Sequence, residues 1–192
     1  MKMILGLMGL SPIELLIVLA VFVLLVGAPL AGVVAVVVLI RRAAGRATPP
    51  AVAGEPTVVR SFEPADAPIS DAAHWIGNEL EVAATEPGPV RLFELPLPNI
   101  DRSLISYRFR IQTDDLRSKV YPEMWCRVVG VGECFSRGLD QKVHGTNRWL
   151  TVEIPFHLRQ GQHADLAKLN LAFEGPGKVR LADIQVLATP LL

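Results

Sequence analysis

An uncharged run of 26 residues, from Leu15 to Ile40, is the feature that most constrains this chain. As a helix rising about 1.5 Å per residue it would be roughly 39 Å long, enough to cross the ~30 Å hydrocarbon core of a bilayer. The run ends at Arg41 and Arg42, whereas a secretory signal has a shorter apolar core followed by small residues. We therefore predict a transmembrane anchor at residues 1–42, which contacts the lipid bilayer through a span at about 15–40.

The number of spans and the side of the membrane follow from a few residues. Gly27 and Pro29 lie within the run and predict a kink. A two-pass hairpin turning there is the alternative to a single span, and it would place Glu14 inside the membrane at a cost. By the positive-inside rule, the basic residues after the run predict a cytoplasmic C-terminal domain; these are Arg41, Arg42 and Arg46.

The charge balance differs between the two parts of the chain. Residues 1–46 contain four of the 19 basic and one of the 19 acidic side chains, which leaves 15 basic and 18 acidic side chains for the remainder. This remainder is mildly acidic and has no stripe of Lys and Arg that could neutralise phosphates. We therefore expect no nucleic-acid partner.

Residues 43–70 are rich in Ala, Pro and Thr, and five of the 15 prolines lie between Pro49 and Pro68. Proline at this density favours an extended, semi-rigid chain. The composition therefore predicts a linker over residues 43–70.

From about Asp71 the sequence changes to short segments with period-two alternation, separated by Gly, Pro and Asn. This pattern is typical of strands, and no amphipathic helix of useful length appears among them. A domain of about 120 residues can bury a sufficient core without metals or disulfides. The sequence predicts a mainly β fold, an antiparallel sandwich or jelly roll over residues 71–192. The expected strands are Glu79–Thr85, Val90–Leu97, Leu104–Gln112, Val120–Val128, Glu133–Leu139, Trp149–Leu158, Ala167–Phe173 and Lys178–Leu187.

Charges and aromatic residues predict the register of one hairpin. Placing Cys126 opposite Cys134 centres the loop on Gly130, which tolerates a turn conformation. The same register brings together two opposite charge pairs and an aromatic pair, which cross-strand energetics favour. The predicted pairs are Trp125 with Phe135, Glu123 with Arg137, and Arg127 with Glu133. In the last strand the alternation changes parity near Ala182 and Asp183, which predicts a bulge.

One face of this hairpin is a candidate ligand-binding surface. Aromatic rings beside paired charged groups are typical of sites for sugars and other polar ring-shaped ligands. The alternative is a solvated sheet face whose ion pairs neutralise each other. The candidate residues are Tyr121, Glu123, Trp125, Arg127, Phe135 and Arg137.

Other reactive side chains predict little chemistry. Cys126 and Cys134 would form a disulfide only in an oxidising compartment and would be thiols in the cytoplasm. Asp183, at the predicted bulge, is a weak candidate for a structural Ca²⁺ site; otherwise we expect no cofactor. No candidate acid or base in the sequence has the partner residues that a catalytic site needs, so we expect no catalysis.

Several segments between residues 79 and 188 resemble galactose-binding-like domains, the jelly rolls related to carbohydrate-binding modules. These segments are Ser106–Ile111, Tyr121–Cys126, Phe135–Leu139, Gly145–Trp149, Lys168–Leu171 and Gly175–Ile184. The resemblance implies a jelly-roll fold and a carbohydrate-like ligand. Arg180 and Ala182 stand where many relatives have Trp and Asp, which weakens a Ca²⁺ site at Asp183.

The N-terminus has two resemblances of its own. Gly9 and Glu14 have the spacing of the type IV prepilin processing site, with Leu10 in place of the usual Phe. The segment Glu14–Leu19 is also similar to the span of twin-arginine translocase A-type subunits. We predict a membrane-anchored, non-catalytic binding module. The alternatives are a structural or protein-interaction domain of a membrane complex and, more remotely, a pilin-like subunit cleaved after Gly9.

Overall fold

The computed structural model describes residues 54–192, which contain nine strands and no helix. The predicted anchor, its span at 15–40 and the processing site at Gly9 lie outside these residues. Nowhere in residues 54–192 is there a helix long and apolar enough to cross a membrane. The strands are β1 (Thr57–Ser61), β2 (Ala73–Ile76), β3 (Glu79–Ala84), β4 (Gly88–Asp101), β5 (Ser103–Val128), β6 (Gly132–Arg137), β7 (Val143–His157), β8 (His163–Phe173) and β9 (Gly177–Pro190).

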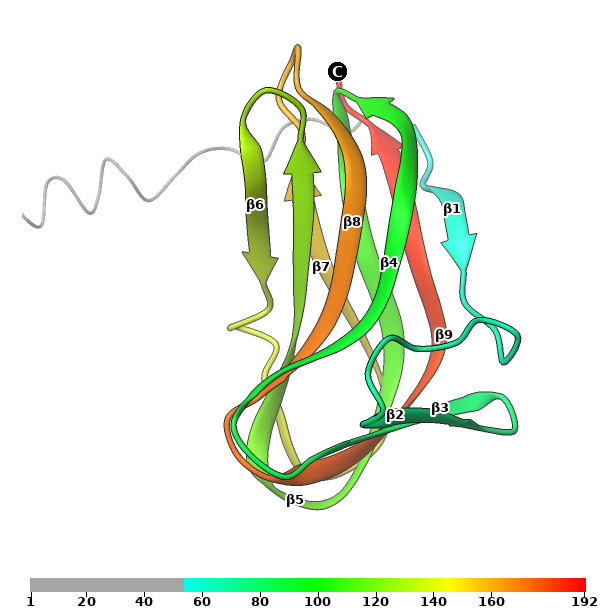
Figure 1. Ribbon diagram of the computed structural model, residues 1–192, viewed down its shortest axis with the longest axis vertical. Coiled ribbons are helices and arrows are strands. Elements are labelled where there is room, and N and C mark those ends of the chain that lie inside the picture. The colour runs from blue at the N-terminus through cyan, green and yellow to red at the C-terminus, as the bar shows by residue number, and fades with distance from the viewer. Residues whose placement is uncertain (1–53) are drawn as a thin grey trace, which may run out of the picture. The chain divides into compact units, whose positions relative to one another are not determined.

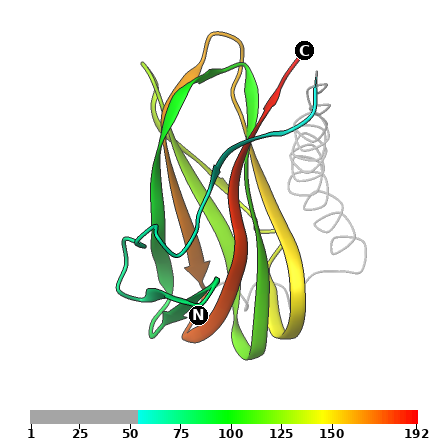
Figure 2. The ribbon, with the colours of Figure 1, turned by 90° about the vertical axis from the view of Figure 1, so that its right-hand side faces the viewer.

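The strands form two antiparallel layers that face each other (Figures 1 and 2). Layer one contains β3, β9, the first half of β5 and β7, with β1 beside β9 and β2 beside β3. Layer two contains β4, β8, the second half of β5 and β6. The predicted mainly β, antiparallel sandwich is confirmed for this part of the chain.

Strand β5 belongs to both layers. The sequence predicts two separate strands here, Leu104–Gln112 and Val120–Val128, but the structure has one strand of 26 residues. It bends where its register with β7 shifts, between Ile111 and Val120, and Asp115 has a φ of +43°. The bend takes the chain from layer one into layer two without ending the strand (Figure 1), so the prediction of two strands is wrong.

The folded domain begins earlier than predicted. Strand β1 pairs with β9, so that Thr57 lies opposite Ala188. The ring of Phe62 is buried in the core and stacks on Phe93 with 4.2 Å between ring centroids. The predicted linker of residues 43–70 is therefore wrong from residue 57 onward, because β1 contributes a strand and the following segment a core residue. Residues 43–53 lie outside the described part.

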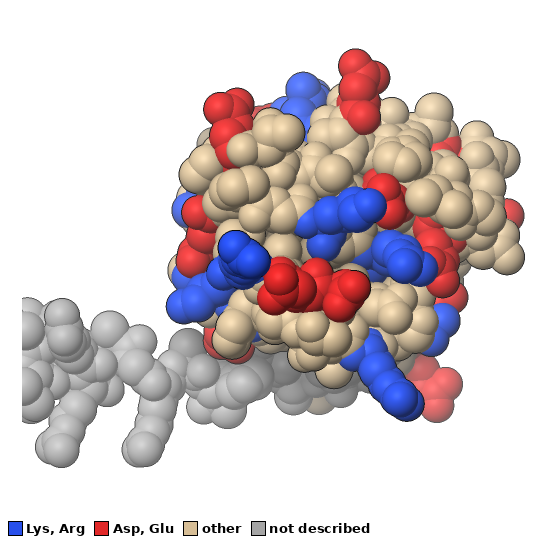
Figure 3. Space-filling view, turned by 90° about the horizontal axis from the view of Figure 1, so that it is seen from below, with Lys and Arg blue, Asp and Glu red and all other residues tan. Residues whose placement is uncertain are grey.

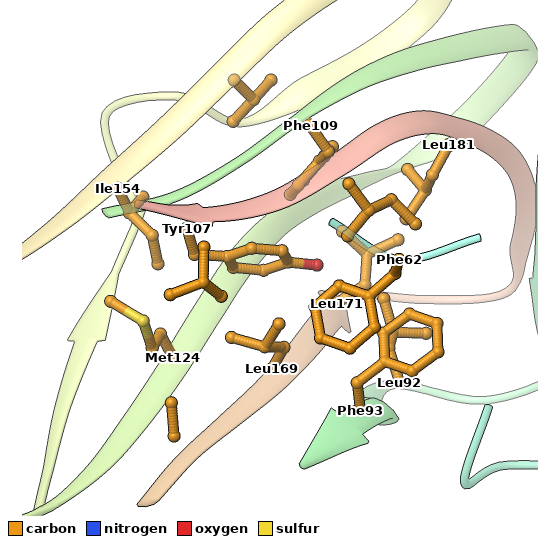
Figure 4. Packing of buried hydrophobic residues seen from close by; sticks show 14 of the residues in the cluster. Phe62, Leu92, Phe93, Tyr107, Phe109, Met124, Ile154, Leu169, Leu171 and Leu181 are labelled. Atoms are coloured by element: carbon orange, nitrogen blue, oxygen red, sulfur yellow. The ribbon is translucent and has the colours of Figure 1, made fainter. Parts of the chain in front are cut away.

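Alternating side chains of the two layers form the core (Figure 4). Tyr107, Phe109 and Ile111 point inward from β5, as the alternation predicts, and meet Leu169 and Leu171 of β8. The expected bulge in β9 is confirmed as well. Arg108 pairs with Gln185 and Arg110 with Ala182, which leaves an extra residue in β9, and Asp183 has a φ of +51°.

Candidate functional site

The predicted register of the β5–β6 hairpin is confirmed at every predicted pair: Cys126–Cys134, Trp125–Phe135, Glu123–Arg137 and Arg127–Glu133. Met124 and Cys126 of β5 point into the core, so their neighbours along the strand point outward. The six candidate residues therefore share the outer surface of layer two. We call this surface, formed by Tyr121, Glu123, Trp125, Arg127, Phe135 and Arg137, the Trp125 face.

Two aromatic rings lie at the centre of the Trp125 face. The ring centroids of Trp125 and Phe135 are 5.0 Å apart and their planes are inclined by 43°. Phe135 is 53% exposed, whereas Trp125 is half-buried. The guanidinium of Arg137 lies 4.7 Å from the centroid of the Phe135 ring, a cation–π contact. The pair forms an apolar platform bordered by a cation.

The carboxylate of Glu123 holds this platform in place. It is only 4% exposed and accepts hydrogen bonds from Trp125 Nε1 at 2.7 Å, Arg137 Nε at 2.5 Å and Asn170 Nδ2 at 3.3 Å. Burial by itself raises the pKa of Glu123, but these three hydrogen bonds and the charge of Arg137 outweigh it, so the pKa is lowered. Glu123 is therefore charged at neutral pH and fixes the orientation of the Trp125 indole.

Asn170 was missed by the sequence reasoning. It lies on β8 directly opposite Glu123 and 47 residues further along the chain. The alternating pattern of β8 places Asn170 on the opposite side of the strand from Leu169 and Leu171, and this is the feature of the sequence that indicates an outward-facing Asn170. The pattern does not show which strand lies beside β5.

Arg127 and Glu133 lie opposite each other, but each forms its ion pair with a different residue. Arg127 donates two hydrogen bonds to the Asp165 carboxylate, at 2.7 and 2.9 Å, and Glu133 accepts one from Lys168. The predicted mutual pair is therefore wrong, because β8 supplies both competing charges. The hydrogen bond from Arg127 lowers the pKa of Asp165.

Tyr121 is set apart from the aromatic platform. The Lys142 ammonium lies 5.4 Å from the centroid of its ring and also pairs with Glu174. The structure thus joins four of the six predicted residues into one cluster (Glu123, Trp125, Phe135 and Arg137), whereas Tyr121 and Arg127 interact with residues from outside the set.

The two cysteines are free and differ in exposure: Cys126 is buried and Cys134 partly exposed. Burial, together with the neighbouring Cys134, raises the pKa of the Cys126 thiol to about 12.

Because the thiolate is the reactive form, we expect an alkylating reagent at neutral pH to label one thiol in the folded domain and two after unfolding. Mass spectrometry would count the labels, and Cys134→Ser should abolish labelling of the folded protein. Rapid labelling of Cys126 in the folded protein would contradict the expectation. The disulfide stays a prediction.

Asp183 does not have the surroundings of a calcium ligand. Its carboxylate accepts a hydrogen bond from Arg110 Nε at 2.5 Å and so is already paired with a cationic side chain. Within residues 54–192 no group of three or more His, Cys, Asp or Glu side chains could hold a metal ion. The donor set at Asp183 does not fit Ca²⁺.

The outer surface of layer one is hollowed, which the sequence reasoning did not anticipate. Hollows of about 470 and 320 Å³ share Asp183 and Gln185. A cleft of about 650 Å³ lies further along β5 and β9, where Gln112 and Arg180 face each other. The alternation of Arg108 and Arg110 with the core residues of β5 is the signal that this surface is polar.

Comparisons with known proteins find similarity only among solved structures: no family model and no curated protein matches this chain. A xylan-binding module, CBM15, is 12% identical with a TM-score of 0.43, over 70% of this chain and 97% of its own. The CBM22-1 xylan-binding domain from Paenibacillus barcinonensis is 11% identical with a TM-score of 0.43, over 77% and 90%. A family 16 carbohydrate-binding module is 7% identical with a TM-score of 0.42, over 62% and 82%. Similarity this weak carries no argument about function.

Proposed function

We propose that residues 54–192 are a non-catalytic binding module whose Trp125 face takes a saccharide, within a chain anchored in the membrane by residues 15–40. The observation that carries the proposal is the aromatic platform of the half-buried Trp125 and the exposed Phe135 beside the buried Glu123. Aromatic rings offer the apolar face of a sugar a flat contact. Charged groups that can form hydrogen bonds with sugar hydroxyls surround this platform; they belong to Arg137, Lys168 and Glu133.

The absence of a catalytic role is part of the proposal. Glu123 is the one charged residue that is buried among the residues that the structure describes. Its lowered pKa keeps it ionised and three donors already contact it, so it has no proton to give as a general acid. The buried carboxylate therefore acts as a positioning group for Trp125 rather than as an acid or base.

Phe135→Ala tests the platform. We expect saccharide affinity to fall about tenfold, since one aromatic contact contributes on the order of 1 kcal/mol. The side chain is 53% exposed, so thermal stability should hardly change. Affinity electrophoresis against a panel of soluble neutral and acidic polysaccharides would measure binding. Leu139→Ala, at a side chain that is 54% exposed, is the matched control and should bind as the parent does.

A second variant identifies the face that binds. Arg110→Ala alters the hollowed surface of layer one and should leave saccharide affinity unchanged. If Arg110→Ala weakens binding and Phe135→Ala does not, the ligand occupies layer one and our placement is wrong. Failure of every polysaccharide to bind would favour the alternative, a protein-interaction domain. The cytoplasmic location stays a prediction from Arg41, Arg42 and Arg46.

A further inference from the structure

Five segments meet at one end of the sandwich, which we call the entry end. They are the start of β1, the β4–β5 turn, the β5–β6 hairpin loop, the β7–β8 turn and the residues after β9 (Figure 1). Backbone hydrogen bonds connect them: Val129 N to His163 O, Leu158 N to Ser103 O, and Leu191 N to Arg102 O. The entry end is therefore one connected surface rather than a set of independent loops.

The β5–β6 hairpin loop presents apolar side chains at this end. Val129 and Val131 are 60% and 62% exposed. Gly130 and Gly132 have φ values of +76° and +110°, and Val131 N donates to Val128 O across the turn. This tight turn holds the two valine side chains in solvent, so they do not contribute to the hydrophobic core of their own domain.

The opposite end of the sandwich has a different character. The bend of β5 exposes Asp114, Asp115, Arg117 and Lys119 there, and Figure 3 shows mixed acidic and basic side chains over this end. The two exposed valines of the hairpin loop therefore distinguish the entry end from the end formed by the bend of β5.

The chain also enters the domain at the entry end. A Cβ on Gly54 would lie 4.0 Å from Pro190 Cδ, and Thr57 pairs with Ala188. Only eleven residues, 43–53, separate Gly54 from Arg42, a reach of at most about 40 Å. If residues 15–40 span the membrane, as the sequence predicts, the chain that leaves the span reaches the domain at its entry end.

We propose that the entry end rests on the bilayer surface, with Val129 and Val131 in the interfacial region and Arg102 and Arg159 donating to lipid phosphates. The arginines lie in the β4–β5 and β7–β8 turns and are exposed. Asp101 and Glu55 are exposed at the same end, so the apolar tip provides the contact and the arginines orient it. The proposal rests on the predicted span and is independent of saccharide binding.

The test uses the full chain in nanodiscs of phosphatidylcholine with phosphatidylglycerol. An environment-sensitive fluorophore is attached at Gln160→Cys, in the β7–β8 turn, in a Cys134→Ser background. We expect blue-shifted emission and strong quenching by brominated acyl chains. The same fluorophore at Asp115→Cys, in the bend of β5, should emit as it does in water.

Two sets of substitutions complete the test. Val129→Asp with Val131→Asp should abolish the shift and the quenching at residue 160. Ile76→Asp is the matched control: it changes a side chain that is 52% exposed in the β2–β3 hairpin and should leave the signal intact. Equal signals from the fluorophores at residues 160 and 115 would overturn the proposal. So would failure of the chain to insert into the disc, because the span that positions the entry end would then be absent.

Discussion

Replacing Glu123 by alanine is expected to lower the free energy of unfolding by about 3 kcal/mol, because it breaks a buried ion pair and leaves three donors without their acceptor. Arg137 is 40% exposed and can turn toward water, which limits the loss. The Trp125 Nε1 and Asn170 Nδ2 groups have less freedom. Urea unfolding followed by tryptophan fluorescence would measure the change.

The effect has a pH signature. The pKa of Glu123 is lowered in the folded domain from its ordinary value of 4.5, so its charge stabilises the fold above that value. This contribution is lost as the pH falls through the folded pKa. Glu123→Gln should therefore flatten the acid side of the stability profile relative to the parent. Glu133→Ala is the control, since Glu133 pairs with Lys168 at the surface and should cost less than about 1 kcal/mol. Equal losses for Glu123→Ala and Glu133→Ala would contradict the role assigned to the buried carboxylate.

At Tyr107 two substitutions should change stability in opposite directions. The ring is fully buried between the layers and lies 4.9 Å from the Phe109 ring centroid. Its hydroxyl has no hydrogen-bond partner in the described structure, and burial raises its pKa. Tyr107→Ala should cost about 4 kcal/mol through the cavity it creates. Tyr107→Phe should raise the free energy of unfolding by about 1 kcal/mol, because it removes a buried polar group that nothing satisfies.

The two variants at Tyr107 separate packing from polarity, since both remove the hydroxyl and only alanine removes the ring. Thermal or urea unfolding would give both values. If Tyr107→Phe is destabilising, the hydroxyl has a partner, such as a bound water, that supports the fold.

The sequence predicted local pairing better than long-range pairing. The β5–β6 register follows from charges and rings within fifteen residues, since a hairpin offers each side chain one facing neighbour. The bulge at Asp183 follows from a parity change inside a single strand. In contrast, Arg127 pairs with Asp165, 38 residues away, and no local pattern distinguishes Asp165 from Glu133 as its partner.

The missed elements share a physical cause. Strand β1 lies in a segment rich in proline and is held by β9, whose residues come about 130 positions later. The continuity of β5 depends on Asp115 adopting a positive φ, which an aspartate tolerates and a turn would also use. At the Trp125 face, the alternation placed Glu123 on the outer surface but could not show its burial, because Asn170, Trp125 and Arg137 cover it from three strands.

Strand β9 also sets the order in which this domain can be made. It lies between β3 and β5 and pairs with β1 as well, yet it is the last of the nine strands to leave the ribosome. Until it emerges, β1 and β3 have no central strand to pair with, and layer one cannot close over the core. Contacts this distant in sequence form slowly, so in a nascent chain the part of the core that β9 covers stays open until synthesis of the domain is nearly complete.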